Sequence, residues 1–206
     1  MIQKLKKVLY TADNPDVFVI VRAADDGSIQ AWSIARFRAA CVIARIKHQL
    51  GNVELLVPKH ALLRAKSLVD VASEALVVSH GNWRMETLRL LDASDKVAES
   101  IVHVSNLKQL EKLNVNALSV SDLYCEIVIS KKTVKCKGEF GAITMPVKFA
   151  SPGSIGISLR YLAEAVKNLI ATETVSLGIA RYKETHVLVL ASEHERHYIA
   201  EMRKKR

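Results

Sequence analysis

Few residues in this sequence have types and spacing that could do chemistry, and the closest candidates are His194 and His197. Two histidines this close bind a metal ion when a helix points both rings the same way. Here the pair comes just before an expected strand, HYIAEM, in which the two rings would not converge. The sequence therefore favours ordinary polar histidines over a metal site.

Other patterns that carry catalysis are missing from the sequence. It has neither a GxxxxGK[ST] nor a GxGxxG loop, and no paired carboxylates stand out. The stretch Gly153-Ser154-Ile155-Gly156 is expected to be only a turn. Cys41, Cys125 and Cys136 are odd in number and lack CxxC spacing, which indicates reduced thiols in a cytosolic protein. These patterns predict a protein that is not an enzyme and uses no metal or cofactor.

Basic side chains are concentrated on four expected helices, at about 2–12, 58–69, 105–117 and 158–171. Counting Asp70 with the second, these helices carry ten basic and three acidic residues, which accounts for most of the net charge of +9. Apolar residues at helical spacing, such as Leu107, Leu110 and Leu113, predict one buried stripe on each helix. The basic residues expected to face outward and bind DNA are Lys4, Lys7, Arg64, Lys108, Lys112, Arg160 and Lys167.

Two interpretations fit these basic faces. Lysine and arginine are good helix formers and keep an exposed face soluble. A solubilising face normally mixes both signs, however, so four basic faces together favour a surface for phosphate groups. Such a surface would bind DNA through its backbone, independently of sequence. Because all seven positions are expected to be exposed, their replacement by alanine should hardly change stability.

The elements that position these helices form a repeat of about 51 residues, in which an amphipathic helix is followed by two or three alternating strands. In the second helix Leu62 and Val69 mark the expected buried stripe, and Ser105 and Ser158 are the expected N-caps of the third and fourth. The least structured join lies at 92–100. The pattern predicts an α+β fold with two domains, 1–96 and 97–206.

Bulk composition sets further limits. The chain has 206 residues, of which 50% are hydrophobic and 25% charged, as in ordinary globular proteins. Aromatic residues make up only 5%, which disfavours base stacking as a binding mode. The charged start MIQKLKK argues against a secretory signal, and no apolar run is long enough to span a membrane. The composition predicts a cytoplasmic protein that does not bind membranes.

Three segments resemble the DNA sliding clamp family. SIGISLRYLAEAVKNL with TVSLGIARYKETHVLVL and HYIAEMR is similar to the last part of the bacterial DNA polymerase III beta clamp. VELLVPKHALLRAKSLV with EALVVSHGNWRMETLRLL resembles that family's recurrent half-domain, and SIARFRAA resembles its ATDGHRLA stretch. The order resembles the middle and last domains of the bacterial protein, without its first. A ring of this family needs twelve such half-domains, so four half-domains per chain imply a homotrimer, as in two-domain clamps.

The resemblance implies a ring-forming DNA clamp fold and a polymerase processivity factor that encircles double-stranded DNA. The implied partners are a DNA polymerase, a clamp loader and further copies of the chain. The implied location is the cytoplasm, at the nucleoid, or the host cytoplasm if the protein is viral. Two alternatives stay open: a clamp-fold regulatory protein that forms no ring, and a basic DNA-binding protein without a ring.

The resemblance also implies a pocket between the two domains for a short partner peptide. Its expected apolar floor is Phe37, Tyr161 and Ile199, with Arg38 at the rim. The full set of matched positions is Ile34, Phe37, Arg38, Tyr161, Ile199 and Met202. The family's Asp-Gly is replaced by Ala35-Arg36 and its Met-Pro-Met-Arg-Leu ending by AEMRKKR, which implies a changed peptide specificity. Alternatively, Phe37 and Tyr161 are ordinary core or edge aromatics.

Overall fold

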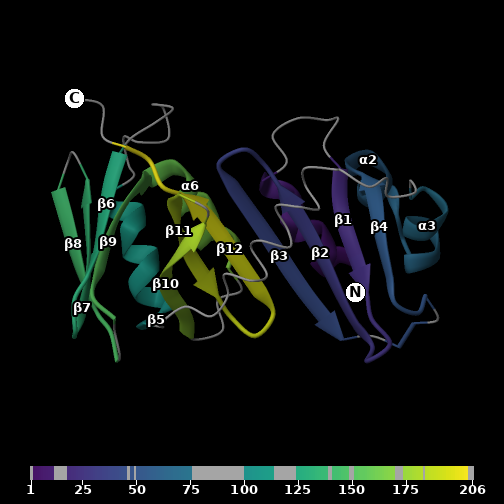
Figure 1. Ribbon diagram of the computed structural model, residues 1–206, viewed down its shortest axis with the longest axis horizontal. Helices are drawn as coiled ribbons and strands as arrows, with labels where there is room; N and C mark the ends of the chain where they lie inside the picture. The colour runs from purple at the N-terminus through teal and green to yellow at the C-terminus, as the bar shows by residue number, and fades with distance from the viewer. Residues whose placement is uncertain are drawn as a thin grey trace. The chain divides into compact units, whose positions relative to one another are not determined.

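The computed structural model describes residues 2–11, 18–45, 47–48, 50–75, 100–113, 124–138, 141–148, 151–169, 174–182 and 184–203 (Figure 1). Its contacts divide the chain into unit 1, Met1–Asp92 with Glu193–Arg196, and unit 2, Ala93–Ser192 with His197–Arg206. The predicted domain boundary at 96/97, the predicted strand WRMETLRLL and the part of EALVVSHG after Ala75 lie outside the described residues.

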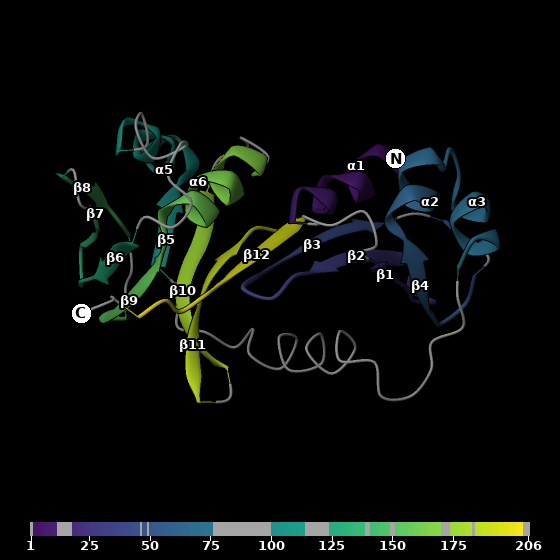
Figure 2. The ribbon, with the colours of Figure 1, turned by 90° about the horizontal axis from the view of Figure 1, so that it is seen from above.

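Unit 1 is a four-stranded antiparallel sheet with short helices on one face (Figure 2). Its strands follow the order β4-β1-β2-β3. The elements are α1 (Ile2–Leu5), the 3-10 helix η1 (Lys6–Thr11), β1 (Phe18–Ala23), β2 (Ser28–Ile34), β3 (Arg38–Arg45), β4 (Val53–Pro58), α2 (Lys59–Arg64) and α3 (Leu68–Ser73). Leu5, Val8 and Leu62 bury their side chains against Val19 and Val21 of β1 in one apolar cluster.

The second predicted helix is in fact two. A break at Ala65–Ser67 separates α2 from α3, and Ser67 begins α3 with a capping box. The backbone N–H of Asp70 donates to Ser67 Oγ (3.2 Å), while the N–H of Ser67 donates to Asp70 Oδ2 (2.9 Å). The new helix turns a different face inward, so Leu68 and Val71 are buried and Val69 is 73% exposed. The prediction that Val69 lies in the buried stripe was therefore wrong.

Unit 2 contains the predicted repeat twice, each time as a strand, a helix and three strands. The first repeat is β5 (Ser100–His103), α5 (Val104–Leu107), η2 (Lys108–Leu113), β6 (Tyr124–Ile129), β7 (Thr133–Gly138) and β8 (Gly141–Pro146). The second is β9 (Gly153–Ser158), α6 (Leu159–Asn168), β10 (Thr174–Tyr182), β11 (Thr185–Ala191) and β12 (Glu195–Ala200). Helix and strand residues of both repeats pack into a single core cluster.

Three details of unit 2 differ from the sequence predictions. Residues Gly153 to Gly156 were expected to be a turn, but they form the first part of β9 and pair with β6, with Ile155 opposite Ile127. The third helix is capped by His103 rather than Ser105, and its second half is a 3-10 helix. Ser158 is the N-cap of α6, but its side chain makes no capping hydrogen bond. Glycine and serine are typical of turns, so their presence in β9 favoured the wrong prediction. Ile155 and Ile157 hold this strand in the core.

The two units share a sheet topology. The order β4-β1-β2-β3 in unit 1 repeats as β9-β6-β7-β8 in unit 2, as expected of a duplicated half-domain. In unit 1 the outer edge of β3 is paired, because the N–H of Ile43 donates to the carbonyl of His194 (2.7 Å). The corresponding edge in unit 2 is β8, which has β7 as its one strand partner among the described residues. The same edge is therefore covered in one half-domain and open in the other.

Gly156 gives a direct test of the packing in unit 2. A methyl group at this position would overlap the Tyr124 ring and come within 2.7 Å of the Met202 carbonyl oxygen. We expect Gly156→Ala to lower the free energy of unfolding by about 1–3 kcal/mol, measured by chemical denaturation. Gly138→Ala is the matched control, since its new methyl group meets neighbours only at 3.9 Å. Equal stability of the two variants would contradict this packing.

Candidate functional site

The helices of unit 1 present basic side chains on neighbouring elements. The Nζ of Lys6 donates to the carbonyl of Leu63 (2.8 Å), which ties η1 to α2. Lys4 on α1 and Arg64 on α2 are both exposed, and Lys66 is exposed just beyond α2. We call the exposed faces of α1, η1 and α2 the helix surface of unit 1. It can offer several cations to one extended polyanion.

Lys7 has a structural partner that its exposure alone does not reveal. Its Nζ lies 3.6 Å from Oε1 of Glu195, and the two side chains are 41% and 1% exposed. A buried carboxylate is costly unless a charge or a hydrogen bond compensates it. We therefore expect Lys7 to stabilise the start of β12 within unit 1, in contrast to the sequence-based prediction that replacing any of the seven positions hardly changes stability.

A shallow hollow of about 350 Å³ lies between α2 and α3. His60, Arg64 and Lys66 line it together with Asp70 and Glu74. The backbone N–H groups of Lys66 and Ser67 donate to the Asp70 carboxylate and lower its pKa below the ordinary value. Asp70 thus stays charged inside the hollow, and the mixed signs make it a poorer phosphate site than the neighbouring helix surface.

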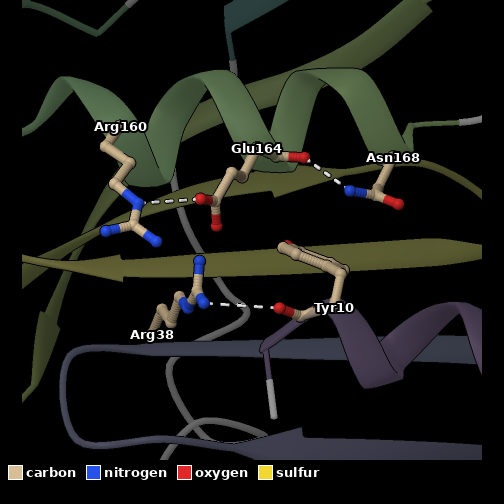
Figure 3. A network of polar contacts seen from close by, with 5 residues as sticks. All are labelled: Tyr10, Arg38, Arg160, Glu164 and Asn168. Atoms are coloured by element: carbon tan, nitrogen blue, oxygen red, sulfur yellow. Dashed lines mark hydrogen bonds and ion pairs between the residues drawn. The ribbon is translucent and has the colours of Figure 1, made fainter. Parts of the chain in front are cut away.

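The helices of unit 2 carry the other predicted DNA contacts. Lys108 on η2 and Lys167 on α6 are exposed, whereas the side chain of Lys112 lies outside the described part of the chain. Arg160 donates from Nε to Oε1 of Glu164 (2.9 Å), four residues along α6 (Figure 3). This ion pair partly neutralises Arg160. The helix surface of unit 2, formed by the exposed faces of α5, η2 and α6, therefore rests mainly on Lys108 and Lys167.

Three predicted pocket residues belong to unit 1, at the turn between β2 and β3. Phe37 is 49% exposed, with the guanidinium of Arg36 over its ring at 5.0 Å. Ile34 is buried. Arg38 was expected at a rim, but it is only 5% exposed, and its Nη2 donates to the carbonyl of Tyr10 (3.3 Å; Figure 3). Arg38 thus holds η1 to the sheet instead of facing a ligand.

The other predicted pocket residues belong to unit 2. Tyr161 is partly buried against the core cluster that contains Ile199. Met202 is partly exposed, and its N–H donates to the carbonyl of Gly156 (2.7 Å).

The preceding Glu201 accepts hydrogen bonds from the N–H of His186 and the hydroxyl of Thr185. Partial burial raises the pKa of Glu201, but hydrogen bonds with the His186 ring, the His186 N–H and the Thr185 hydroxyl outweigh it and lower the pKa below the ordinary value. The segment after β12 is therefore held by hydrogen bonds to both β9 and β11. Since the pocket would need residues of both units, it stays a prediction.

The sequence interpretation missed one group of basic residues. Lys131, Lys132, Lys135, Lys137 and Lys148 are all exposed on or beside the sheet β8-β7-β6-β9 of unit 2. The signal was present in TVKCKG, where lysines alternate with residues that the structure buries. The sequence-based prediction of DNA contacts covered basic residues on the expected helices and not these strand lysines.

The described residues offer little for catalysis or metal binding. No group of three His, Cys, Asp or Glu side chains in this part of the chain could hold a metal ion. His194 lies exposed in the turn before β12, whereas His197 is buried. The Sγ atoms of Cys125 and Cys136 lie 3.3 Å apart in the core, and the contact with Cys136 together with burial raises the pKa of Cys125. No described helix is long and apolar enough to cross a membrane.

Lys7 and Lys4 can be separated experimentally. Because Lys7→Ala removes a cation from beside the buried Glu195, we expect it to lower the free energy of unfolding by about 1–2 kcal/mol. Lys4→Ala changes an exposed residue and should stay within about 0.5 kcal/mol of the parent. Chemical denaturation measures both. A Lys7 variant as stable as the Lys4 variant would show that the contact with Glu195 contributes nothing.

Comparison with known proteins shows which fold this structure resembles. No protein-family model and no curated protein matches the sequence. Solved structures do match: the DNA polymerase III beta subunit of Thermotoga maritima has a TM-score of 0.69 at 11% identity, covering 99% of this chain and 63% of that one. The sliding clamp of Pseudomonas aeruginosa gives 0.68 at 12% identity, with 98% and 65% covered. The beta subunit of Borrelia burgdorferi gives 0.64 at 16% identity, with 99% and 62% covered. The chain thus spans slightly less than two thirds of these structures, and its fold is that of the DNA polymerase III beta sliding clamps.

Proposed function

We propose that this protein is a sliding clamp: copies of the chain close into a ring around duplex DNA and carry partner proteins along it. The observation that supports this most is the clamp fold over nearly the whole chain, combined with exposed basic residues on the helices of both units. Enclosure would keep the protein on DNA. It needs no enzymatic activity of its own.

The repeated topology suggests how the ring closes. The edge of β3 is covered in unit 1, while the equivalent edge of β8 has no second strand partner among the described residues. Open strand edges favour pairing with another chain. A head-to-tail contact through β8 would extend the sheet from one copy to the next. With two units per chain and six in a family ring, three copies complete the assembly.

The charge on the helices suits sliding rather than recognition. Lys4, Arg64, Lys108 and Lys167 are exposed. Lysines dominate this set, and their flexible ammonium groups bind phosphates without reading bases. Each contact is weak and exchangeable, so the ring could move along the duplex while the topology prevents its loss.

Recruitment of partner proteins would use exposed apolar side chains. Phe37 is one of three large apolar side chains that are exposed among the described residues, beside Leu63 and Val69. An exposed aromatic at a turn can accept an apolar side chain of an extended peptide. DNA polymerase and a clamp loader are the proposed sources of such a peptide, with Tyr161 and Met202 as further contacts.

The assembly is tested by mass in solution. We expect a species of about three times 22.8 kDa by native mass spectrometry, in the presence or absence of DNA. The variant A142E/T144E places charges on the edge strand β8 and should give monomers. Its new carboxylates would face Lys137 and Lys135 in the register, so the subunit itself should fold. A142S/T144S is the matched control. A stable monomer or dimer at micromolar concentration, with no trimer on DNA, would contradict the ring.

DNA binding is tested by salt dependence. Alanine at Lys4, Arg64, Lys108 or Lys167 should weaken binding to all duplex sequences alike. Each lost contact should reduce the slope of log K against log salt concentration by about 0.9, measured by fluorescence anisotropy. Lys47→Ala is the control, because Lys47 is exposed but lies outside the helices. A variant that changed the preference between two sequences would rule out a purely phosphate-binding surface.

A further inference from the structure

Outside the helices, a group of exposed lysines lies on unit 2. We call it the sheet face: the outward side of β6, β7, β8 and β9, with the turns that border it. Five lysines belong to it, namely Lys131, Lys132, Lys135, Lys137 and Lys148. None of them is part of the helix surfaces assigned to duplex DNA above.

Strand geometry fixes the direction of two of these lysines. In β7, Val134 and Cys136 are buried, so Lys135 and Lys137 point to the opposite, exposed side. Two residues along a strand span about 6.6 Å, which separates the two ammonium groups along the strand. In the register, Lys135 lies between Thr144 of β8 and Val128 of β6.

The neighbouring turn brings the remaining lysines to one end of the same face. The N–H of Ser130 donates to the carbonyl of Thr133 (2.8 Å), which closes the turn that carries Lys131 and Lys132. The N–H of Val147 donates to the carbonyl of Lys132 (3.0 Å), so the chain leaving β8 lies beside this turn. Lys148 follows directly. The fold therefore gathers lysines from two separate segments.

The sheet face carries a net positive charge. No ion pair joins any of the five lysines to a carboxylate in the part of the chain that the structure describes. The nearest acidic position in the register is Glu126, opposite Lys137 and partly buried. On the helices, by contrast, Lys7 and Arg160 are paired with glutamates. Five lysines beside one such glutamate make the sheet face attractive for an anion.

Its other properties distinguish among possible partners. Protein-binding surfaces usually centre on large apolar or aromatic anchors. The exposed large apolar side chains of the described residues are Phe37, Leu63 and Val69, and all three belong to unit 1. The sheet face instead offers point charges on flexible stems, without arginine. This combination fits phosphate groups better than it fits a folded protein.

We propose that the sheet face of unit 2 is a second, sequence-independent binding surface for the phosphate backbone of nucleic acid. It is separate from the helix surface of the same unit, because the inner side of this sheet packs against the helices: Ile127 and Val134 share one core cluster with Leu107 and Leu162. A segment held here is therefore not the segment held by α6 and η2. The proposal does not depend on ring formation.

Two variants that each remove four charges test it. The sheet variant is K131Q/K132Q/K135Q/K137Q, and the helix variant is K4Q/R64Q/K108Q/K167Q. Both change exposed residues, so thermal unfolding should stay as in the parent protein. Binding to a short single-stranded oligonucleotide and to a duplex of equal length is measured by anisotropy across a range of salt concentrations. The two probes distinguish which form of nucleic acid the face binds.

We expect the sheet variant to lose slope in log K against log salt with at least one probe. Four contacts correspond to a loss of about 2.8 units for a single strand and about 3.6 for a duplex, since each contributes about 0.7 or about 0.9. The helix variant should keep this part of the slope. Bound nucleic acid should also slow acetylation of Lys135 and Lys137 by an amine-reactive reagent, read by mass spectrometry.

Two results would overturn the proposal. One is a sheet variant whose slopes equal those of the parent with both probes. The other is tighter binding of polyglutamate than of nucleic acid, lost in the sheet variant, which would identify an acidic protein segment as the partner instead.

Discussion

Burial of one apolar stripe per helix is the interaction on which the rest of this structure depends. Leu62 on α2, Leu107 on α5 and Leu162 on α6 have no exposed surface, and each packs against strands of its own unit. Burying one such side chain contributes about 1.5–3 kcal/mol. Since the apolar stripe must face the sheet, the lysines and arginines at the remaining helix positions point outward. The basic surface is a consequence of packing, and it keeps its place because the core fixes the helix rotation.

The repeat of the half-domain explains the regularity of the fold and why equivalent edge strands occur in both units. The same strand order occurs in each unit, so the same edge strand arises twice, as β3 and as β8. A sheet edge exposes unpaired backbone N–H and carbonyl groups, and proteins normally cover or disable it. Residues 193–196 cover the edge of β3. The equivalent edge strand β8 has β7 as its one strand partner among the described residues.

Charge in this protein has three physically different uses. Lys7 lies beside the buried Glu195 and serves stability. Arg160 pairs with Glu164 along α6, where such an exposed i,i+4 pair contributes only a few tenths of a kcal/mol. The lysines of the sheet face have no such partner in the described part of the chain and remain available to an external anion. Counting basic residues alone does not separate these uses, because the partner and its burial decide what each cation does.

The sequence by itself determined the α+β class and the repeated helix-and-strand unit, because these depend on local periodicity, while its motifs carried the resemblance to sliding clamps. Spacing alone predicts the burial of Leu107 and Leu110 and the alternation of side chains in β7. The structure showed that the second helix breaks at Ser67 and exposes Val69, because a local capping box competes there with continued helix. Only the tertiary structure decided that Gly153–Gly156 is a strand, that Arg38 is buried against Tyr10 and that Lys7 meets Glu195. Each of these last three features depends on a partner far away along the chain, and spacing carries no information about such a partner.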